Sequence, residues 1–281
     1  MVDADANSVG EKALTRDAAL LREAVREAGR LALSMFRTDL KKWTKGASSP
    51  VSEADIAVND LLEGRLRRAT PDYGWLSEES ADDEARLSKK LVWIVDPIDG
   101  TRRYLGGYED WCVSVALVST AMARPVLAAV FAPASDEFFF AARGQGATLN
   151  DRPIRAAPGT EINFARIAGP KTLIEPVMAR VKPQAGEFKL HPRIGSLALR
   201  LCRVAQGALD AAFASGESRD WDIAAADLIV REAGGRVGEL LPQDAACMFY
   251  NRAEVTHGAL VAAGRYRLER IIAHFRERPL S

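Results

Sequence analysis

The chain has 281 residues, no net charge and enough apolar residues to build a substantial core. Its 38 Lys and Arg balance 38 Asp and Glu, and 48% of its residues are hydrophobic. This composition excludes a disordered chain and argues against nucleic acid or a membrane as the main partner. Three cysteines without CxxC spacing exclude a zinc or disulfide framework. They are typical of a reducing compartment, so we expect a cytoplasmic protein.

The N-terminal half predicts two helices followed by an antiparallel sheet. Apolar residues at helical spacing run over 17–36, and the capping pattern Ser52-Glu-Ala-Asp55 opens a second helix after a Lys- and Ser-rich loop at 41–50. From residue 91 the apolar period changes to two. Strands are predicted at 91–96, 111–119, 126–132 and 137–142. Because short turns separate these strands, we expect antiparallel pairing.

The C-terminal half alternates strands with helices, which is typical of a parallel or mixed sheet with flanking helices. Strands are predicted at 164–168, 187–191, 209–214, 236–240 and 258–263, and helices at 171–181, 196–206, 222–233 and 265–276. We therefore predict a layered α/β sandwich, αβαβα, with two parts at residues 1–153 and 154–281. A ligand cleft is expected between these parts.

Two aspartates mark the end of the first predicted core strand. Asp96 and Asp99 lie in Trp-Ile-Val-Asp-Pro-Ile-Asp-Gly-Thr, where they would repel each other without a cation or strong donors. Oxygen ligands on a short turn suit Mg²⁺, which leaves its other positions to water and phosphate. Gly100 permits close approach of the backbone, and the amides of Gly100 and Thr101 would open a helix, where anions bind. The stretch therefore predicts phosphate chemistry with a metal.

Other acidic residues have structural explanations when each is taken alone. Glu78 and Glu79 fit the solvated start of the next segment, Asp55 fits a capping box, and Asp222 fits an N-cap. No histidine has a neighbouring acidic or serine motif. The chain also lacks a dinucleotide fingerprint and a P-loop, which argues against a dehydrogenase or a kinase.

Together, these motifs resemble those of the inositol monophosphatase superfamily. Their order is Glu-Glu at 78–79, Asp-Pro-Ile-Asp-Gly-Thr at 96–101 and Trp-Asp-Ile-Ala-Ala at 221–225, and the resemblance covers Ala18 to Gly264. Its members are Mg²⁺-dependent, typically lithium-sensitive phosphomonoesterases, and they include the CysQ-type 3′(2′),5′-bisphosphate nucleotidases. The resemblance implies a homodimer that hydrolyses a small phosphorylated metabolite and binds two or three Mg²⁺ ions per site.

The resemblance also implies which residues hold the metals. Glu78, Asp96 and the Ile98 carbonyl would bind a first Mg²⁺, while Asp96, Asp99 and Asp222 would bind a second. The first metal would lower the pKa of the attacking water, and the second would stabilise the departing alkoxide.

Further residues would bind phosphate or support the site, by the same resemblance. The amides of Gly100 and Thr101 would hold the phosphate. The Thr101 hydroxyl, hydrogen-bonded to Asp55, would help to position the water. Glu79 would support the metal ligands, and Lys45 would approach a third, weaker metal.

The identity of the phosphate ester is left open. Inositol phosphatases usually carry a glutamate seven residues before the second-motif aspartate, but here that residue is Ser215, and Glu217 is out of register. Arg102 and Arg103 resemble the nucleotidase branch and would neutralise a second phosphate, unless they are ordinary solvated residues. These features slightly favour 3′-phosphoadenosine 5′-phosphate over inositol 1-phosphate. The alternative of another class is a non-catalytic, metal-dependent binding or regulatory protein.

Overall fold

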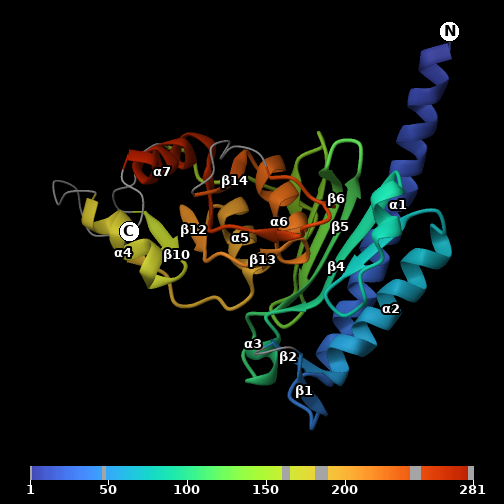
Figure 1. Ribbon diagram of the computed structural model, residues 1–281, viewed down its shortest axis with the longest axis horizontal. Coiled ribbons are helices and arrows are strands. Elements are labelled where there is room, and N and C mark those ends of the chain that lie inside the picture. Colours follow the sequence, from blue (N-terminus) through green and yellow to red (C-terminus); the bar gives the residue numbers. More distant parts are fainter. Residues whose placement is uncertain (1, 46–48, 160–164, 181–188, 241–247, 278–281) are drawn as a thin grey trace.

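The computed structural model describes residues 2–45, 49–159, 165–180, 189–240 and 248–277, which form alternating layers of helix and sheet. The helices in these ranges are α1 (Val2–Met35), α2 (Glu53–Ala69), α3 (Thr101–Leu105), α4 (Lys171–Arg180), α5 (Leu197–Ala205), α6 (Asp220–Glu232), α7 (Arg265–Glu277) and a short 3₁₀ helix at Glu84–Ser88. From right to left, Figure 1 shows α1 and α2, a large sheet, α5 and α6, a smaller sheet, and finally α4 and α7. This αβαβα sandwich confirms the predicted fold class.

The larger sheet has seven strands in the order β3-β4-β5-β6-β7-β8-β9. They are β3 (Gly74–Ser77), β4 (Leu91–Asp99), β5 (Cys112–Ser119), β6 (Arg124–Ala132), β7 (Glu137–Ala142), β8 (Ala147–Leu149) and β9 (Arg152–Ile154). β3 runs parallel to β4, and every later pair is antiparallel. The strands predicted between residues 91 and 142 are therefore present, and two short strands extend the sheet beyond them.

Helices α1 and α2 cover the outer face of this sheet with an apolar stripe. Leu21, Val25, Ala28 and Ala32 on α1 are fully buried against α2 and the sheet. The helix ends at Met35, close to the prediction, but it begins at Val2 rather than Asp17. The extra turns lack the apolar stripe from which the helix was predicted, and in Figure 1 they project beyond the body of the molecule.

The loop predicted at 41–50 is instead an antiparallel pair of strands, β1 (Lys42–Lys45) and β2 (Ser49–Ser52), with residues 46–48 outside the described ranges. The first three residues of β1 are exposed, so the segment shows none of the apolar alternation that predicts a strand. The pairing of Lys42 with Ser52 ties the segment to the start of α2. It also brings Lys45 toward the end of β3.

The smaller sheet is mixed, as predicted, with the order β11-β10-β12-β16-β14. Its strands are β10 (Arg166–Ala168), β11 (Lys189–Leu190), β12 (Ala211–Ala214), β14 (Gly235–Glu239) and β16 (Leu260–Gly264). β10, β11 and β12 are parallel, and β16 lies antiparallel between β12 and β14. A separate antiparallel pair is formed by β13 (Ser218–Arg219), which lies directly before α6 in the chain, and β15 (Thr256–His257). Parts of three predicted elements, at 164, 181 and 187–188, lie outside the described residues.

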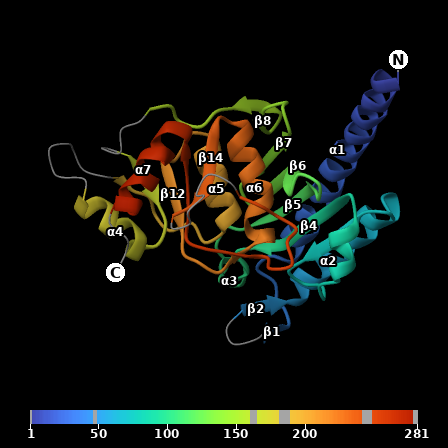
Figure 2. The ribbon, with the colours of Figure 1, turned by 45° about the horizontal axis from the view of Figure 1, so that its top comes forward.

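Helices α5 and α6 fill the space between the sheets and join them through one apolar core (Figure 2). This core contains residues of β5 and β6 from the larger sheet and of β12 and β16 from the smaller one. The division at residue 154 coincides with the end of β9, and its status as a domain boundary stays a prediction. Among the described helices, none combines the length and the apolar character needed to cross a membrane.

Candidate active site

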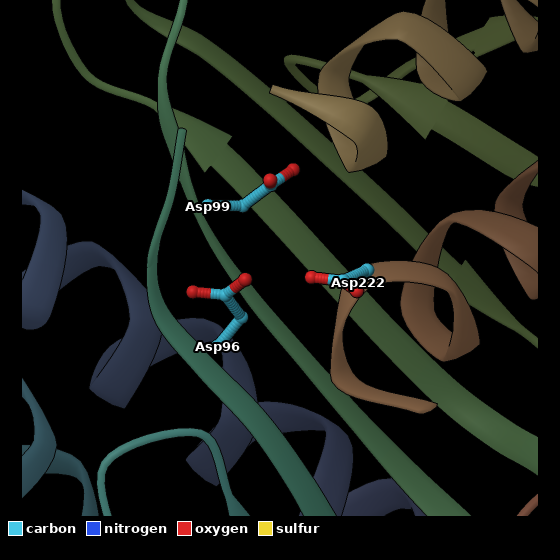
Figure 3. Close-up of side chains that lie close together, drawn as sticks. All are labelled: Asp96, Asp99 and Asp222. Atoms are coloured by element: carbon cyan, nitrogen blue, oxygen red, sulfur yellow. The ribbon is translucent and has the colours of Figure 1, made fainter. Parts of the chain in front are cut away.

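Three carboxylates from two distant segments meet where β4 ends and α6 begins (Figure 3). Asp96, Asp99 and Asp222 each offer an oxygen atom, and these oxygens lie within 4.8 Å of one another. Residues three apart on a regular strand point to opposite faces. The pairing of β4 with β5 is irregular between Asp96 and Asp99, and this irregularity lets both side chains face the same space.

Asp222 belongs to the first turn of α6 and points from it toward the two aspartates of β4 (Figure 3). It is not the N-cap that the sequence favoured when this residue was taken alone, because Arg219 occupies that position. One Asp222 oxygen instead accepts a hydrogen bond of 2.6 Å from the Arg219 amide. Helix capping and metal binding are therefore compatible, since each can use a different oxygen.

Asp99 and Asp96 differ in how their buried oxygens are satisfied. Asp99 accepts hydrogen bonds from the Ser196 hydroxyl at 2.6 Å and from the amides of Leu197 at 3.2 Å and Ala198 at 2.6 Å, all at the start of α5. The Oδ1 atom of Asp96 is buried and has no hydrogen-bond partner among the described residues. A buried, unpaired carboxylate oxygen is costly, so this one fits a bound cation.

The electrostatics of the site also fit a divalent cation. Burial, followed by the charges of Glu78, Asp99 and Asp222, raises the pKa of Asp96 well above its usual range. Burial and the Asp99 charge raise the pKa of Asp222 to about 7, while burial and the Asp222 charge raise that of Glu78 to about 8. A cation of charge two relieves this repulsion and favours the ionised carboxylates. The acidic oxygens therefore suit Mg²⁺.

These groups line a cavity of about 400 Å³, which we call the catalytic cavity. Besides the three aspartates, its lining includes Glu78, Ile98, Gly100, Thr101, Arg102, Arg103, Arg193 and Gly195. The main chain at Gly100 has a φ of +94°, and a Cβ atom there would lie 3.3 Å from the backbone of Ser196. Glycine is thus required both by the left-handed backbone and by the close approach of α5.

The hydrogen bond expected between Thr101 and Asp55 is present at 3.1 Å. The Thr101 hydroxyl also lies 3.0 Å from the Ile98 carbonyl, and since it carries one proton it donates to one of these oxygens at a time. Asp55 additionally accepts from the amide and the hydroxyl of Ser52, at 2.8 and 2.6 Å. The capping box and the link to Thr101 therefore exist together.

Glu79 and Lys45 form an ion pair at the edge of the site. Lys45 also donates a hydrogen bond of 2.8 Å to the main-chain carbonyl of Glu78. The hairpin strand β1 is thus fastened to the end of β3, which presents Glu78 to the cavity. The role of Lys45 near a third metal stays a prediction.

The substrate residues proposed from the sequence lie in different surroundings. Arg103 donates a hydrogen bond of 2.7 Å to Asp110 and stacks on Tyr108 at 3.6 Å, so a carboxylate already neutralises its charge. Ser215 lines a second cavity next to the catalytic one. Glu217 is exposed, has a φ of +76° and lines neither cavity.

Sequence reasoning missed several residues that shape the site. Ser196 holds Asp99 and caps α5 through a bond from the Leu199 amide, and the Ser before an apolar helix was an available signal. The Nε2 atom of His257 donates a hydrogen bond of 2.7 Å to the buried carboxylate of Asp220, and this bond fixes the start of α6 next to Asp222. Arg193 lines both cavities, and no local pattern distinguishes it from other exposed arginines.

A cluster of acidic oxygens at the end of β4, next to a turn that opens a helix, is typical of a metal-dependent phosphatase. The chain belongs to the inositol monophosphatase family, whose model matches residues 14–280. The predicted resemblance and the predicted phosphatase class are thereby confirmed.

Similar proteins carry two kinds of name. A Nus factor SuhB of Xylella fastidiosa is 35% identical over 236 residues, which cover 82% of this chain and 84% of the relative. An inositol-1-monophosphatase of Mesorhizobium japonicum is 34% identical over 243 residues, covering 79% and 86%. The crystal structure of the suhB protein of Bartonella henselae matches with a TM-score of 0.78 and 28% identity, covering 92% of this chain and 98% of that one.

Proposed function

We propose that this protein is a Mg²⁺-dependent phosphomonoesterase that hydrolyses a small phosphorylated metabolite with an activated water. The observation that carries this proposal is the buried Oδ1 atom of Asp96, which has no hydrogen-bond partner among the described residues and belongs to a carboxylate that lies close to those of Asp99 and Asp222. A bound cation would offset the free-energy cost of burying this carboxylate oxygen without a hydrogen bond. The same cavity contains the start of α3, where main-chain amides suit a phosphate group.

The proposed ligands are the carboxylates of Glu78, Asp96, Asp99 and Asp222 and the carbonyl of Ile98. When bound there, Mg²⁺ supplies charge neutralisation and a lowered water pKa. The protein itself would orient the reactants.

The proposed orienting residues lie at the start of α3. The amides of Gly100 and Thr101 hold the phosphate, and the Thr101 hydroxyl, by donating to Asp55, turns its oxygen lone pairs toward the water. Burial raises the pKa of Asp55, whereas hydrogen bonds from Ser52 and Thr101 lower it, and the balance is a raised value.

Two phosphate esters are the candidate substrates, and different observations favour each. The relative in Mesorhizobium is named an inositol-1-monophosphatase, which favours inositol 1-phosphate. The serine at position 215 and the basic residues around the site favour an ester with a second phosphate, such as 3′-phosphoadenosine 5′-phosphate. Mg²⁺-dependent phosphate release from each ester, with and without lithium, tests the proposal. No release from either ester, despite bound Mg²⁺, would refute it.

A binding role is the second candidate, because the Xylella relative is named a Nus factor. In that role the acidic cluster would bind a metal that stabilises the fold and takes no part in catalysis. Binding of RNA that survives Asp96→Asn, in a protein that releases no phosphate, would support this alternative. The expected homodimer, cytoplasmic location and lack of a nucleic-acid partner stay predictions, and light scattering after gel filtration tests the first of them.

A further inference from the structure

The first turn of α6 carries Asp222, but the residue at the helix start cannot fix this turn in the usual way. An N-cap Ser, Thr, Asp or Asn accepts a hydrogen bond from the first turn and so sets its position. Here the N-cap is Arg219, and a guanidinium group has no acceptor atom. The bond from the Arg219 amide joins Asp222 to its own helix and does not place that helix in the molecule. Contacts with other segments must therefore hold Asp222 close to Asp96 and Asp99 (Figure 3).

Asp220, the first residue of α6, supplies these contacts. Its side chain is fully buried, and both carboxylate oxygens have partners. Oδ1 accepts a hydrogen bond of 2.7 Å from the Nε2 atom of His257 on β15, and Oδ2 accepts one of 2.7 Å from the main-chain amide of Asn251. The Asp220 amide donates to the Val255 carbonyl at 3.0 Å. The start of α6 is thus tied to the chain that leads into β15.

Asn251 extends this network toward the larger sheet. Its side-chain carbonyl accepts a hydrogen bond of 2.7 Å from the Arg86 guanidinium, and its side-chain amide donates one of 3.0 Å to the Thr120 hydroxyl, directly after β5. Arg86 is 2% exposed, lies in the 3₁₀ helix and also donates to the Asp82 carboxylate at 2.6 and 2.8 Å. The start of α6 is therefore fixed relative to the sheet that carries the other two aspartates of the cluster.

Stability alone does not explain this network. Asp220, Asn251, His257 and Arg86 are all buried, and none of them lines the catalytic cavity. Buried polar groups lose their hydration, and replacing such a set by apolar side chains of similar volume is often neutral or stabilising. A fully bonded network does, however, fix one orientation more narrowly than apolar packing does. Orientation of the first turn of α6 is the property that these bonds control.

We propose that Asp220 and His257 are positioning residues for the metal site. They hold the first turn of α6 so that Asp222 reaches the cation, and Asn251 and Arg86 anchor this pair to the larger sheet. The inference rests on the metal-dependent function proposed above. Residues that orient metal ligands without touching the metal typically change metal affinity or activity by about 10- to 100-fold when they are replaced.

His257→Leu tests the proposal through metal binding, independently of turnover. Leucine removes the Nε2 donor, and electron paramagnetic resonance measures free Mn²⁺ during titration of the metal-free protein. The affinity for Mn²⁺ is expected to weaken by about 10- to 100-fold. Loss of a neutral or positive ring does not weaken cation binding through charge, so weakening reports the position of Asp222. His257→Gln should restore most of the affinity, because its side-chain amide can donate to Asp220.

Thr70→Val is the matched control, because it also removes one buried hydrogen bond. The Thr70 hydroxyl, 3% exposed, accepts a bond of 2.9 Å from the Nε1 atom of Trp93, between α2 and the outer face of the larger sheet. This variant should have a lower Tm without metal and an unchanged affinity for Mn²⁺. Equal weakening of Mn²⁺ binding in Thr70→Val and His257→Leu would attribute the effect to lost stability and overturn the proposal.

Asn251→Gly cuts the network at a second point and carries the test if His257→Leu does not fold. The main chain at Asn251 has a φ of +59°, which glycine adopts readily, so the amide bond to Asp220 is kept. The side-chain link to Arg86 is lost, and the affinity for Mn²⁺ is expected to fall about tenfold. Unchanged affinity in both His257→Leu and Asn251→Gly, or in Asn251→Gly when it alone folds, would overturn the proposal.

Phosphate release separates this inference from the proposed function. In His257→Leu the Mg²⁺ concentration that gives half-maximal release should rise about 10- to 100-fold, whereas KM for the ester at saturating Mg²⁺ should stay the same. Release that needs no more Mg²⁺ than in the wild type would refute the positioning role while the phosphatase stands. No release of phosphate by the wild type, combined with His257-dependent Mn²⁺ binding, would refute the phosphatase while the positioning role stands. A wild type that binds no Mn²⁺ would refute both.

Discussion

At the scale of single residues, Asp96 differs from its neighbours because its buried Oδ1 atom has no hydrogen-bond donor in the described part of the chain. Asp99 is held by three donors from the start of α5, and Asp222 is held by the Arg219 amide. The protein thus fixes two carboxylates with its own hydrogen bonds, whereas the third is available to the cation proposed above. Preorganisation of this kind lets a bound ion act without rearrangement of its ligands.

Replacing Asp96 tests this assignment directly. We expect Asp96→Asn to lower kcat/KM by a factor on the order of 10² to 10³, because preorganised charge is lost at the reacting phosphate. Without metal, the Tm of this variant should equal or exceed that of the metal-free wild type, because the substitution removes one carboxylate that its acidic neighbours repel. Asp72→Asn, at an exposed position, is the control. Near-normal phosphate release by Asp96→Asn would contradict the metal assignment.

The acidic cluster also predicts how pH affects the metal-free protein. In the folded state the pKa of Asp222 is about 7 and that of Glu78 about 8, above the ordinary values of 3.8 and 4.5. Between the ordinary and the raised values, the folded chain holds protons that the unfolded chain has lost. Stability therefore falls as pH rises through this window.

Thermal unfolding with a chelator should accordingly give a lower Tm at about pH 8 than at about pH 6. Mg²⁺ needs ionised ligands, so its stabilising effect should be larger at the higher pH. Double replacement Glu78→Gln with Asp222→Asn should flatten the pH dependence of the metal-free protein. A Tm that rises with pH without metal would show that the cluster does not hold these protons.

At the scale of elements, β4 and the turn after it were largely predictable, whereas the details that align the ligands were not. The apolar run and Asp-Pro-Ile-Asp-Gly-Thr specify a core strand that ends in carboxylates and a helix start. The irregular pairing between Asp96 and Asp99 depends on β5, a separate segment. The β1–β2 hairpin was missed because its exposed residues carry no apolar period, and Arg193 was missed because only the folded chain places it between two cavities.

Gly100 connects β4 to α3, and replacing it tests how the contact between this turn and α5 affects the site. Gly100→Ala forces a side chain onto a φ of +94° and places its Cβ atom 3.3 Å from the backbone of Ser196. The left-handed backbone costs about 1–2 kcal/mol, and the contact also displaces the start of α5, which holds Asp99. Both stability and kcat/KM should therefore fall.

Gly234→Ala is the matched control, because Gly234 has a φ of +87° but no atom of the described residues lies within 4 Å of the added Cβ atom. It should lose a similar amount of stability in chemical denaturation and keep its phosphatase activity. Equal losses of activity in both variants would indicate that the contact between Gly100 and α5 has no part in aligning the site.

At the scale of the whole molecule, the site depends on two sheets whose relative position is set by α5 and α6. The proposed metal ligands on β4 belong to the larger sheet, while Asp222 lies in the first turn of α6, a helix that packs against both sheets. One continuous core contains apolar residues of both sheets and of these two helices. The sequence predicted two parts from a change in periodicity, but periodicity carries no information about whether the parts share a core. A shared core couples their unfolding.

Leu228, a buried residue of α6 in that core, tests the coupling. Leu228→Ala should destabilise the protein by about 2–5 kcal/mol, because the lost side chain leaves a cavity between the sheets. Calorimetry should still record one transition at a lower Tm, since both sheets lose the same support. Leu33→Ala, at a leucine that is 40% exposed on α1, should cost far less. Two separate transitions, only one of them shifted by Leu228→Ala, would instead mean that residues 1–153 and 154–281 unfold as independent domains and that the metal site lies at a boundary able to open.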